Sequence, residues 1–141
     1  MKNYELIEHT ADIGIRVKAK NLKELFKNTA LSIFEIMAEK KSSIDGDKLE
    51  VEKITINQKA QDLEELFINW LNELLSLSSA KGLIFSDFKI KKLDKNNLEA
   101  EAKGIDIKNY KVNTEIKAAT YHELKIEDKG DFWQAEVIFD V

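Results

Sequence analysis

Two acidic positions, one near each end of the chain, carry residue types that could do chemistry. Asp12 lies in the stretch Glu8-His9-Thr10-Ala11-Asp12-Ile13-Gly14, and Asp140 and Val141 close the sequence. Because a C-terminal residue carries its own α-carboxylate, we expect two carboxylates on adjacent residues at this end. If the fold brings them to Asp12, three acidic groups meet, and each raises the pKa of the others unless a cation or a hydrogen-bond donor joins them.

An all-oxygen set of this kind favours a hard cation. Calcium and magnesium prefer carboxylate oxygens, whereas zinc prefers Cys or His. The chain has no cysteine and two histidines. The alternative interpretation is that Asp12 is a turn residue, because an aspartate carboxylate commonly bonds backbone N–H groups of a tight turn. The sequence alone leaves open whether the two ends of the chain meet.

The remaining polar candidates carry weaker signals. His122 falls on the apolar face of a predicted strand, where a histidine is usually a hydrogen-bonded structural residue, so we expect it to be buried. Lys117 and Tyr121 fall on the opposite face, toward a partner, a substrate or solvent. The sequence has no GxSxG motif, no P-loop and no glycine-rich dinucleotide fingerprint. We therefore assign no catalytic and no cofactor-binding residue.

Two helices are predicted from apolar stripes at helical spacing. Asn21 with Glu24, and Asp62 with Glu65, are capping patterns at the start of such stripes. The stripes predict helices over about 21–40 and about 62–79. Gly82 follows the second helix and suits a left-handed C-terminal turn.

The rest of the chain alternates between apolar and polar residues, as strands do. Strands are predicted near both sides of Asp12, over about 49–56, and in four segments after Gly82, with turns at 94–97 and 128–131. Within 115–127, one face is predicted to hold Ile116, Ala118, Thr120, His122, Leu124 and Ile126. Strands with one polar face pair in mostly antiparallel or mixed sheets. We predict an α+β two-layer sandwich, with both helices packed on one face of a mixed or mostly antiparallel sheet.

Length and composition bound the class of protein. The 141 residues suit one domain, 1–141, and 43% hydrophobic with 34% charged residues is typical of a soluble globular chain. No segment resembles a transmembrane helix or a signal peptide, so we expect a cytoplasmic protein without membrane contact. The net charge of −4 argues against a large nucleic-acid-binding face. Four lysines cluster at a predicted hairpin turn and are best explained by solvation: Lys89, Lys91, Lys92 and Lys95.

Four motifs along the chain resemble those of the archease family. They are the stretch 8–14, Asp62-Leu63-Glu64-Glu65-Leu66 through Trp70-Leu71-Asn72-Glu73-Leu74, Ile116-Lys117-Ala118-Ala119-Thr120-Tyr121-His122, and Ile138-Phe139-Asp140-Val141. Each motif alone is weak. Their order and spacing over nearly the whole chain make the resemblance specific.

The resemblance implies a small cytoplasmic, non-enzymatic protein that assists the tRNA-splicing RNA ligase. That ligase uses GTP and a divalent metal to place a guanylate on its own histidine before it joins RNA ends. Archease promotes the guanylylation and the turnover of the ligase, and it can broaden nucleotide use. The family's metal site uses the aspartate of the HTAD motif and the last two residues, here Asp12, Asp140 and Val141, with calcium as the associated ion. The expected partner is the ligase, without direct nucleic-acid binding.

Two alternatives stay open. A metal-dependent hydrolase would use the same carboxylates, with a pocket and an activated water. A chaperone-like adaptor would need no metal. The sequence departs from the family pattern at Gly104-Ile105, where archeases often have Gly-Glu, and at Tyr110, where they often have histidine. The resemblance therefore assigns no role to that loop.

Overall fold

The fold combines two helices with strands that pair in antiparallel fashion throughout the part of the chain that the structure describes. The structure is a computed structural model, and it describes residues 4–7, 12–42 and 49–141. The elements in chain order are β1 (Glu5–Ile7), β2 (Ile13–Ala19), α1 (Leu22–Met37), β3 (Ala38–Lys40), β4 (Glu52–Lys59), α2 (Leu63–Lys81), β5 (Leu83–Leu93), β6 (Asn97–Asp106), the 3-10 helix η2 (Ile107–Asn109), β7 (Tyr110–Val112), β8 (Ala118–Asp128) and β9 (Trp133–Asp140).

Local capping chemistry sets where both helices begin. The Asn21 side chain accepts a hydrogen bond from the Glu24 N–H at 2.9 Å, and the Asp62 side chain accepts one from the Glu65 N–H at 2.8 Å. Each bond satisfies an N–H group that has no partner inside the helix. Gly82 ends α2 with φ 65° and ψ 45°, a left-handed conformation that glycine adopts without steric cost. The predicted helices and caps are confirmed, except that α1 ends at Met37 and the residues predicted to continue it, Ala38–Lys40, form β3.

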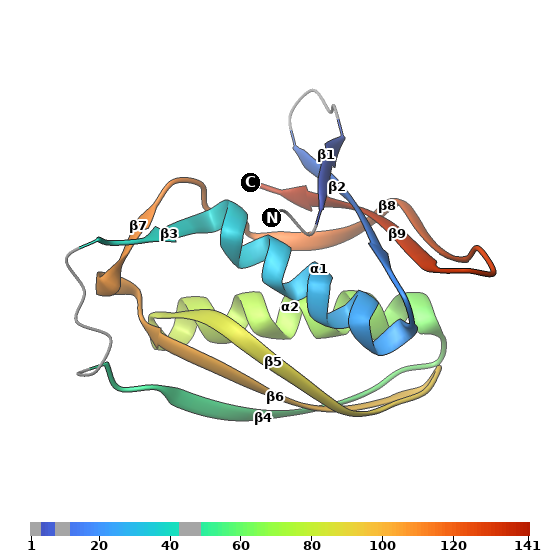
Figure 1. The fold of residues 1–141 in the computed structure, drawn as a ribbon, viewed down its shortest axis with the longest axis horizontal. Coiled ribbons are helices and arrows are strands. Elements are labelled where there is room, and N and C mark those ends of the chain that lie inside the picture. The colour runs from blue at the N-terminus through green and yellow to red at the C-terminus, as the bar shows by residue number, and fades with distance from the viewer. Residues whose placement is uncertain (1–3, 8–11, 43–48) are drawn as a thin grey trace.

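The described strands are divided among three sheets. The largest has the order β1-β2-β9-β8, a second has β4-β6-β5, and β3 pairs with β7 in a short two-stranded sheet. Each helix contacts strands of both larger sheets, α1 through β5 and β2, and α2 through β8 and β5. Figure 1 shows the helices crossing the space between these two sheets. The antiparallel α+β sandwich is confirmed, although the strands do not form the one sheet that we expected.

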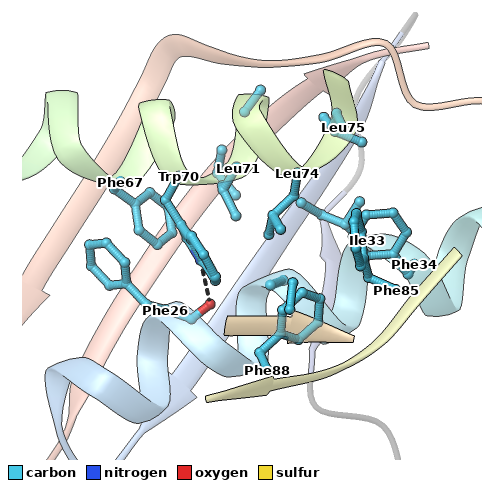
Figure 2. Close-up of a cluster of buried hydrophobic side chains, with 14 of the residues drawn as sticks. Phe26, Ile33, Phe34, Phe67, Trp70, Leu71, Leu74, Leu75, Phe85 and Phe88 are labelled. Atoms are coloured by element: carbon cyan, nitrogen blue, oxygen red, sulfur yellow. Dashed lines mark hydrogen bonds between the residues drawn. The ribbon is translucent and has the colours of Figure 1, made fainter. Parts of the chain in front are cut away.

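Aromatic side chains fill the space between the helices and β5 (Figure 2). Trp70 of α2 is fully buried, and its indole N–H donates to the backbone carbonyl of Phe26 in α1 at 3.0 Å. Phe26 meets Phe67 edge to face at 5.1 Å between ring centroids, and Trp70 meets Phe88 at 5.8 Å. Such pairs contribute about 0.5–1.5 kcal/mol each beyond their burial. This cluster holds α1, α2 and β5 in one arrangement.

Within the described residues, neither helix combines the length and the apolar composition that crossing a bilayer requires.

Candidate functional site

Asp12 stands at the start of β2, next to the C-terminal end of β9. Ile13 and Phe139 form the last residue pair of the antiparallel β2–β9 ladder. Continued by one residue, the same register sets Asp12 opposite Asp140. Residues so placed in a regular antiparallel pair have Cβ atoms about 4.5–5.5 Å apart. The fold therefore brings these two residues from opposite ends of the chain to one place.

Both aspartates belong to the face of the sheet that points away from the helices. Side chains alternate between faces along a strand, and the buried pair Ile15–Val137 and the buried Phe139, opposite the half-buried Ile13, lie on the helix side. The positions of Asp12 and Asp140 have the opposite parity. Asp12 is half-buried and Asp140 is exposed. A ligand or a partner can therefore approach Asp140 from solvent.

The end of β9 is held by backbone pairing. Asp140 is the last residue of β9 and stands opposite Ala118 of β8. The Lys117 N–H donates to the backbone carbonyl of Asp140 at 2.8 Å. Val141 follows the strand and is 43% exposed. The backbone of the chain is therefore paired with β8 as far as Asp140.

The donor chemistry at this end fits a hard cation. Asp12 and Asp140 offer carboxylate oxygens, the ligands that calcium prefers. In the described residues, no group of three His, Cys, Asp or Glu side chains is close enough to hold a metal ion. The predicted set has two such side chains, and its third member is the terminal carboxylate of Val141. The calcium site stays a prediction. Glu8, His9, Thr10 and Ala11 lie outside the described residues.

A charged network occupies the same outer face further along the ladder. Arg16 and Glu136 stand opposite each other, and the guanidinium donates to the Glu136 carboxylate at 2.8 Å from Nε and 2.7 Å from Nη2. Arg16 also reaches Glu5 at 3.2 Å. These bonds, that to Glu136 above all, raise the pKa of Arg16. The network ties β1, β2 and β9 together near the acidic end.

A cavity of about 400 Å³ lies between this network and the acidic end. Its apolar walls include Ile7, Leu124 and Ile138, and its polar lining includes Glu123 and Glu136. Gly14 and Ile138 form the outward-facing pair next to Asp12 and Asp140. The outer face of the sheet is therefore hollowed beside the aspartates.

The prediction of a buried His122 is wrong. Its side chain is 62% exposed, with Nε2 at 3.9 Å from the Glu123 carboxylate. The register of β8 against β9 changes between Thr120–Ile138 and Lys125–Glu136. Four residues of β8 there stand opposite one residue of β9, so β8 contains three extra residues. Thr120 pairs with the outward-facing Ile138, so the face that the alternation assigned to the core begins on the outer side of the sheet, and the odd number of extra residues turns it inward only by Ile126.

Lys117 precedes β8 and Tyr121 lies within it, and both are exposed. Burial, with the negative charges of Glu65 and Asp62, raises the pKa of the Tyr121 phenol. Both residues remain accessible to a partner, which is one of the outcomes that the sequence left open.

A family model described as "Archease protein family (MTH1598/TM1083)" matches residues 4–141. The chain belongs to the archease family. It is similar to protein archease of Methanosarcina barkeri, with 37% identity over 99% of this chain and 97% of the relative. It is also similar to protein archease of Sulfurisphaera tokodaii, with 36% identity over the whole of both chains.

Two solved structures support the same family assignment. The solution structure of Methanobacterium thermoautotrophicum protein 1598 matches over the whole of both chains, with 30% identity and a TM-score of 0.68. The crystal structure of "an archease, possible chaperone" from Thermotoga maritima covers 96% of this chain and 94% of its own, with 30% identity and a TM-score of 0.65. The resemblance seen in the sequence motifs is confirmed.

The two departures from the archease pattern have structural explanations here. Ile105 is 5% exposed and stands opposite the buried Ile84, so its side chain is buried. Tyr110 is half-buried, and burial raises its pKa, opposed in part by a hydrogen bond with Ser86. Both residues pack against the body of the protein.

Two features of the site were missed at the level of sequence. Asn72 of α2 forms two hydrogen bonds with the backbone of Ala119 in β8. Its only signal was a polar residue at the margin of an apolar stripe. Glu123 has φ 53°, and among the described residues it is the one non-glycine with a positive φ. A Tyr-His-Glu-Leu sequence within an alternating pattern gave no sign of this conformation.

Proposed function

We propose that the chain is a cytoplasmic, non-enzymatic activator of the tRNA-splicing RNA ligase. In this proposal it promotes guanylylation of the ligase and its multiple turnover, through an acidic calcium site formed by Asp12, Asp140 and Val141. The observation that carries the proposal is archease family membership over residues 4–141, together with the register that sets Asp12 opposite Asp140.

The position of the two aspartates supports a role toward a partner. They lie on the face of the β1-β2-β9-β8 sheet that the helices leave open, and Asp140 is exposed. The net charge of −4 suits contact with a protein better than contact with RNA. The ligase is therefore proposed as the direct partner.

Calcium is the proposed ion because the donors are all oxygens. Bound there, it would offset the repulsion between the carboxylates and, with few protein ligands, would accept further oxygen ligands from the ligase or its nucleotide phosphates. Without an ion, the neighbouring negative charges of Asp12 and Asp140 oppose the folded state.

Exchange of one carboxylate for an amide tests the proposal. Asp12→Asn and Asp140→Asn keep the side-chain shape and remove the charge repulsion, so each metal-free variant should melt at or slightly above the parent's temperature. Calcium should raise the melting temperature of the parent and of neither variant. Guanylylation of the cognate ligase should be stimulated by the parent and lost with both variants. Thermal melts with chelator and with calcium, beside the guanylylation assay, measure all three effects.

A matched control uses an aspartate at the other end of the β8–β9 hairpin. Asp131 is exposed in the turn before β9, so Asp131→Asn makes the same charge change far along the strand from Asp140. It should keep both the calcium shift and the activation. One added C-terminal glycine should move the terminal carboxylate and weaken calcium binding. An Asp12 or Asp140 variant that keeps both the calcium shift and the activation would refute the site.

A second candidate function comes from the Thermotoga maritima archease, which is described as a possible chaperone. A chaperone-like adaptor would suppress aggregation of unrelated proteins, and Asp12→Asn would leave that suppression unchanged. Light scattering of a heat-denatured unrelated enzyme, with parent and variant, separates the two functions.

A further inference from the structure

The side chain of Asn72 is bonded to the backbone of a single strand residue. Its Oδ1 accepts from the Ala119 N–H at 2.7 Å, and its Nδ2 donates to the Ala119 carbonyl at 3.2 Å. Both backbone polar groups of Ala119 are thus satisfied by one amide side chain from α2. Asparagine suits this role because it carries a donor and an acceptor side by side, as a neighbouring strand would present them.

The bonded residue lies next to the acidic end of the sheet. Ala118 stands opposite Asp140, and Ala119 stands opposite Phe139. The Lys117 N–H bonds the Asp140 carbonyl at 2.8 Å, and the Thr120 hydroxyl donates to the Ile138 carbonyl at 2.8 Å. A bond that fixes Ala119 therefore also fixes the strand against which Asp140 is aligned.

This start of β8 has little other support from its ladder. Its register with β9 holds for three pairs, from Ala118–Asp140 to Thr120–Ile138, before the three extra residues interrupt it. β8 is also the outer strand in the order β1-β2-β9-β8. A short ladder at the outer edge of a sheet opens easily, since local opening follows the density of stabilising contacts. The two bonds from α2 hold the side of this segment that β9 does not pair.

We propose that Asn72 is a positioning residue for the acidic end. It holds the start of β8 against α2, and through β8 it holds the end of β9 at the place where Asp140 faces Asp12. The inference rests on the proposed function only for its calcium readout. Residues that orient metal ligands from outside the coordination sphere typically change affinity by about 10- to 100-fold when they are altered.

Asn72→Leu is the main test, because leucine has a similar size and cannot bond Ala119. Calcium affinity, measured by calorimetric titration with calcium chloride, should fall by about 10-fold. Amide hydrogen exchange, measured by NMR on the 16.2 kDa protein, should speed up at Ala119 and at Phe139 and Asp140. Asn72→Asp keeps the acceptor for the Ala119 N–H, so its calcium affinity should lie between those of the parent and the leucine variant. If Asn72→Leu does not fold, the same measurements on Asn72→Asp provide the test.

Trp70→Phe is the matched control. Trp70 lies in α2, as Asn72 does. The substitution removes the buried hydrogen bond from Trp70 to the Phe26 carbonyl of α1 and leaves the Asn72–Ala119 bonds in place. The melting temperature should fall, while calcium affinity should stay within about twofold of the parent, because the change does not touch β8. The exchange rates of Ala119 and Asp140 should remain close to those of the parent.

The outcomes separate the two proposals. Equal loss of affinity in Asn72→Leu and Trp70→Phe would mean that Asn72 acts only through stability, and would overturn the inference. Unchanged calcium affinity together with unchanged amide exchange in Asn72→Leu would also overturn the inference. A parent protein that binds no calcium would refute the metal site alone. Exchange at Asp140 would then decide the role of Asn72, with faster exchange supporting it and unchanged exchange overturning it.

Discussion

The two larger sheets differ in the size of the irregularities in their ladders. In the β4-β6-β5 sheet, which we call the regular sheet by comparison, the β4–β6 ladder runs without interruption from Glu52–Gly104 to Lys59–Asn97, and the β5–β6 ladder has two shifts of one residue each. In the β1-β2-β9-β8 sheet, three extra residues separate the two parts of the β8–β9 ladder. The irregular stretch borders the cavity beside the acidic end. The three-residue insertion in β8 thus shapes the face where we propose the function.

The outer faces of the two sheets differ in how their charged side chains are paired. On the regular sheet, Glu101 accepts a bond from Lys91 at 2.7 Å and lies 3.8 Å from Lys53, and the bond from Lys91 above all lowers the pKa of Glu101. The outer face of the irregular sheet also pairs opposite charges, Arg16 with Glu136, but at its end the continued register places Asp12 opposite Asp140. Opposite charges across a ladder stabilise a sheet and like charges destabilise it. The acidic end therefore differs from the charge-paired surface of both sheets, and it is where we propose the calcium site.

The largest effect is expected from a glycine in the regular sheet. In Gly104→Ala, the new Cβ would lie 2.8 Å from the Ile84 carbonyl oxygen and 3.0 Å from Phe85 Cδ1. Gly104 sits in the central strand β6, where the opposing backbone cannot move without breaking pairs. We expect the free energy of unfolding to fall by about 3 kcal/mol, as for an overpacked core. Urea unfolding followed by circular dichroism measures it.

Gly14→Ala is the corresponding change in the irregular sheet. There the new Cβ would lie 3.3 Å from Ile7 Cβ, and Ile7 belongs to the three-residue outer strand β1. A short outer strand can shift by a few tenths of an ångström, so the loss should be about 1 kcal/mol or less. Equal losses for the two variants would show that the sheets do not differ in rigidity.

A smaller change in stability is expected from the backbone of the β8 segment that contains the three extra residues. Glu123 has φ 53°, a conformation that costs a side chain with a Cβ atom about 1–2 kcal/mol. Glycine relieves this cost and loses about 0.5–1 kcal/mol through its freedom in the unfolded state. Glu123→Gly should therefore stabilise the protein by about 0.5–1 kcal/mol, which thermal melts will detect.

Glu127→Gly is the control for Glu123→Gly. Glu127 lies in the regular part of β8, opposite Gln134, where glycine loses conformational freedom together with the exposed Glu127–Lys129 ion pair at 3.2 Å. It should destabilise the protein by about 0.5–1 kcal/mol. A destabilising Glu123→Gly would mean that the positive φ of Glu123 is absent in solution.

Sequence reasoning succeeded where the determinants are local. Asn21, Asp62 and Gly82 act within one turn of their own helix, so residue type and spacing were enough to locate the helix ends. The turn at 128–131 is local in the same way, with Gly130 at φ 93°. The division of the strands among sheets depends on contacts between distant segments, and no residue pattern fixed it.

The candidate site shows the same limit. The alternation in β2 and β9 predicted two strands, but the register that sets Asp12 opposite Asp140 comes from the whole sheet packing on the helices. In β8, the alternation of apolar and polar residues continues through 120–126, whereas the pairing with β9 is interrupted there. An insertion in a ladder depends on the partner strand, which the local pattern does not contain.

The smallest effect is expected at His122, and it tests this failure directly. The alternating pattern placed Thr120 and His122 on one face, whereas the structure half-buries Thr120 and leaves His122 62% exposed. Thr120→Val removes the hydroxyl that donates to the Ile138 carbonyl at 2.8 Å, and should cost about 1 kcal/mol. His122→Ala changes an exposed side chain, so it should alter the free energy of unfolding by no more than about 0.5 kcal/mol. Urea unfolding of both variants at one pH gives the comparison. A loss near 2 kcal/mol in His122→Ala would contradict the exposed position of His122 and restore the buried histidine that the alternating pattern predicted.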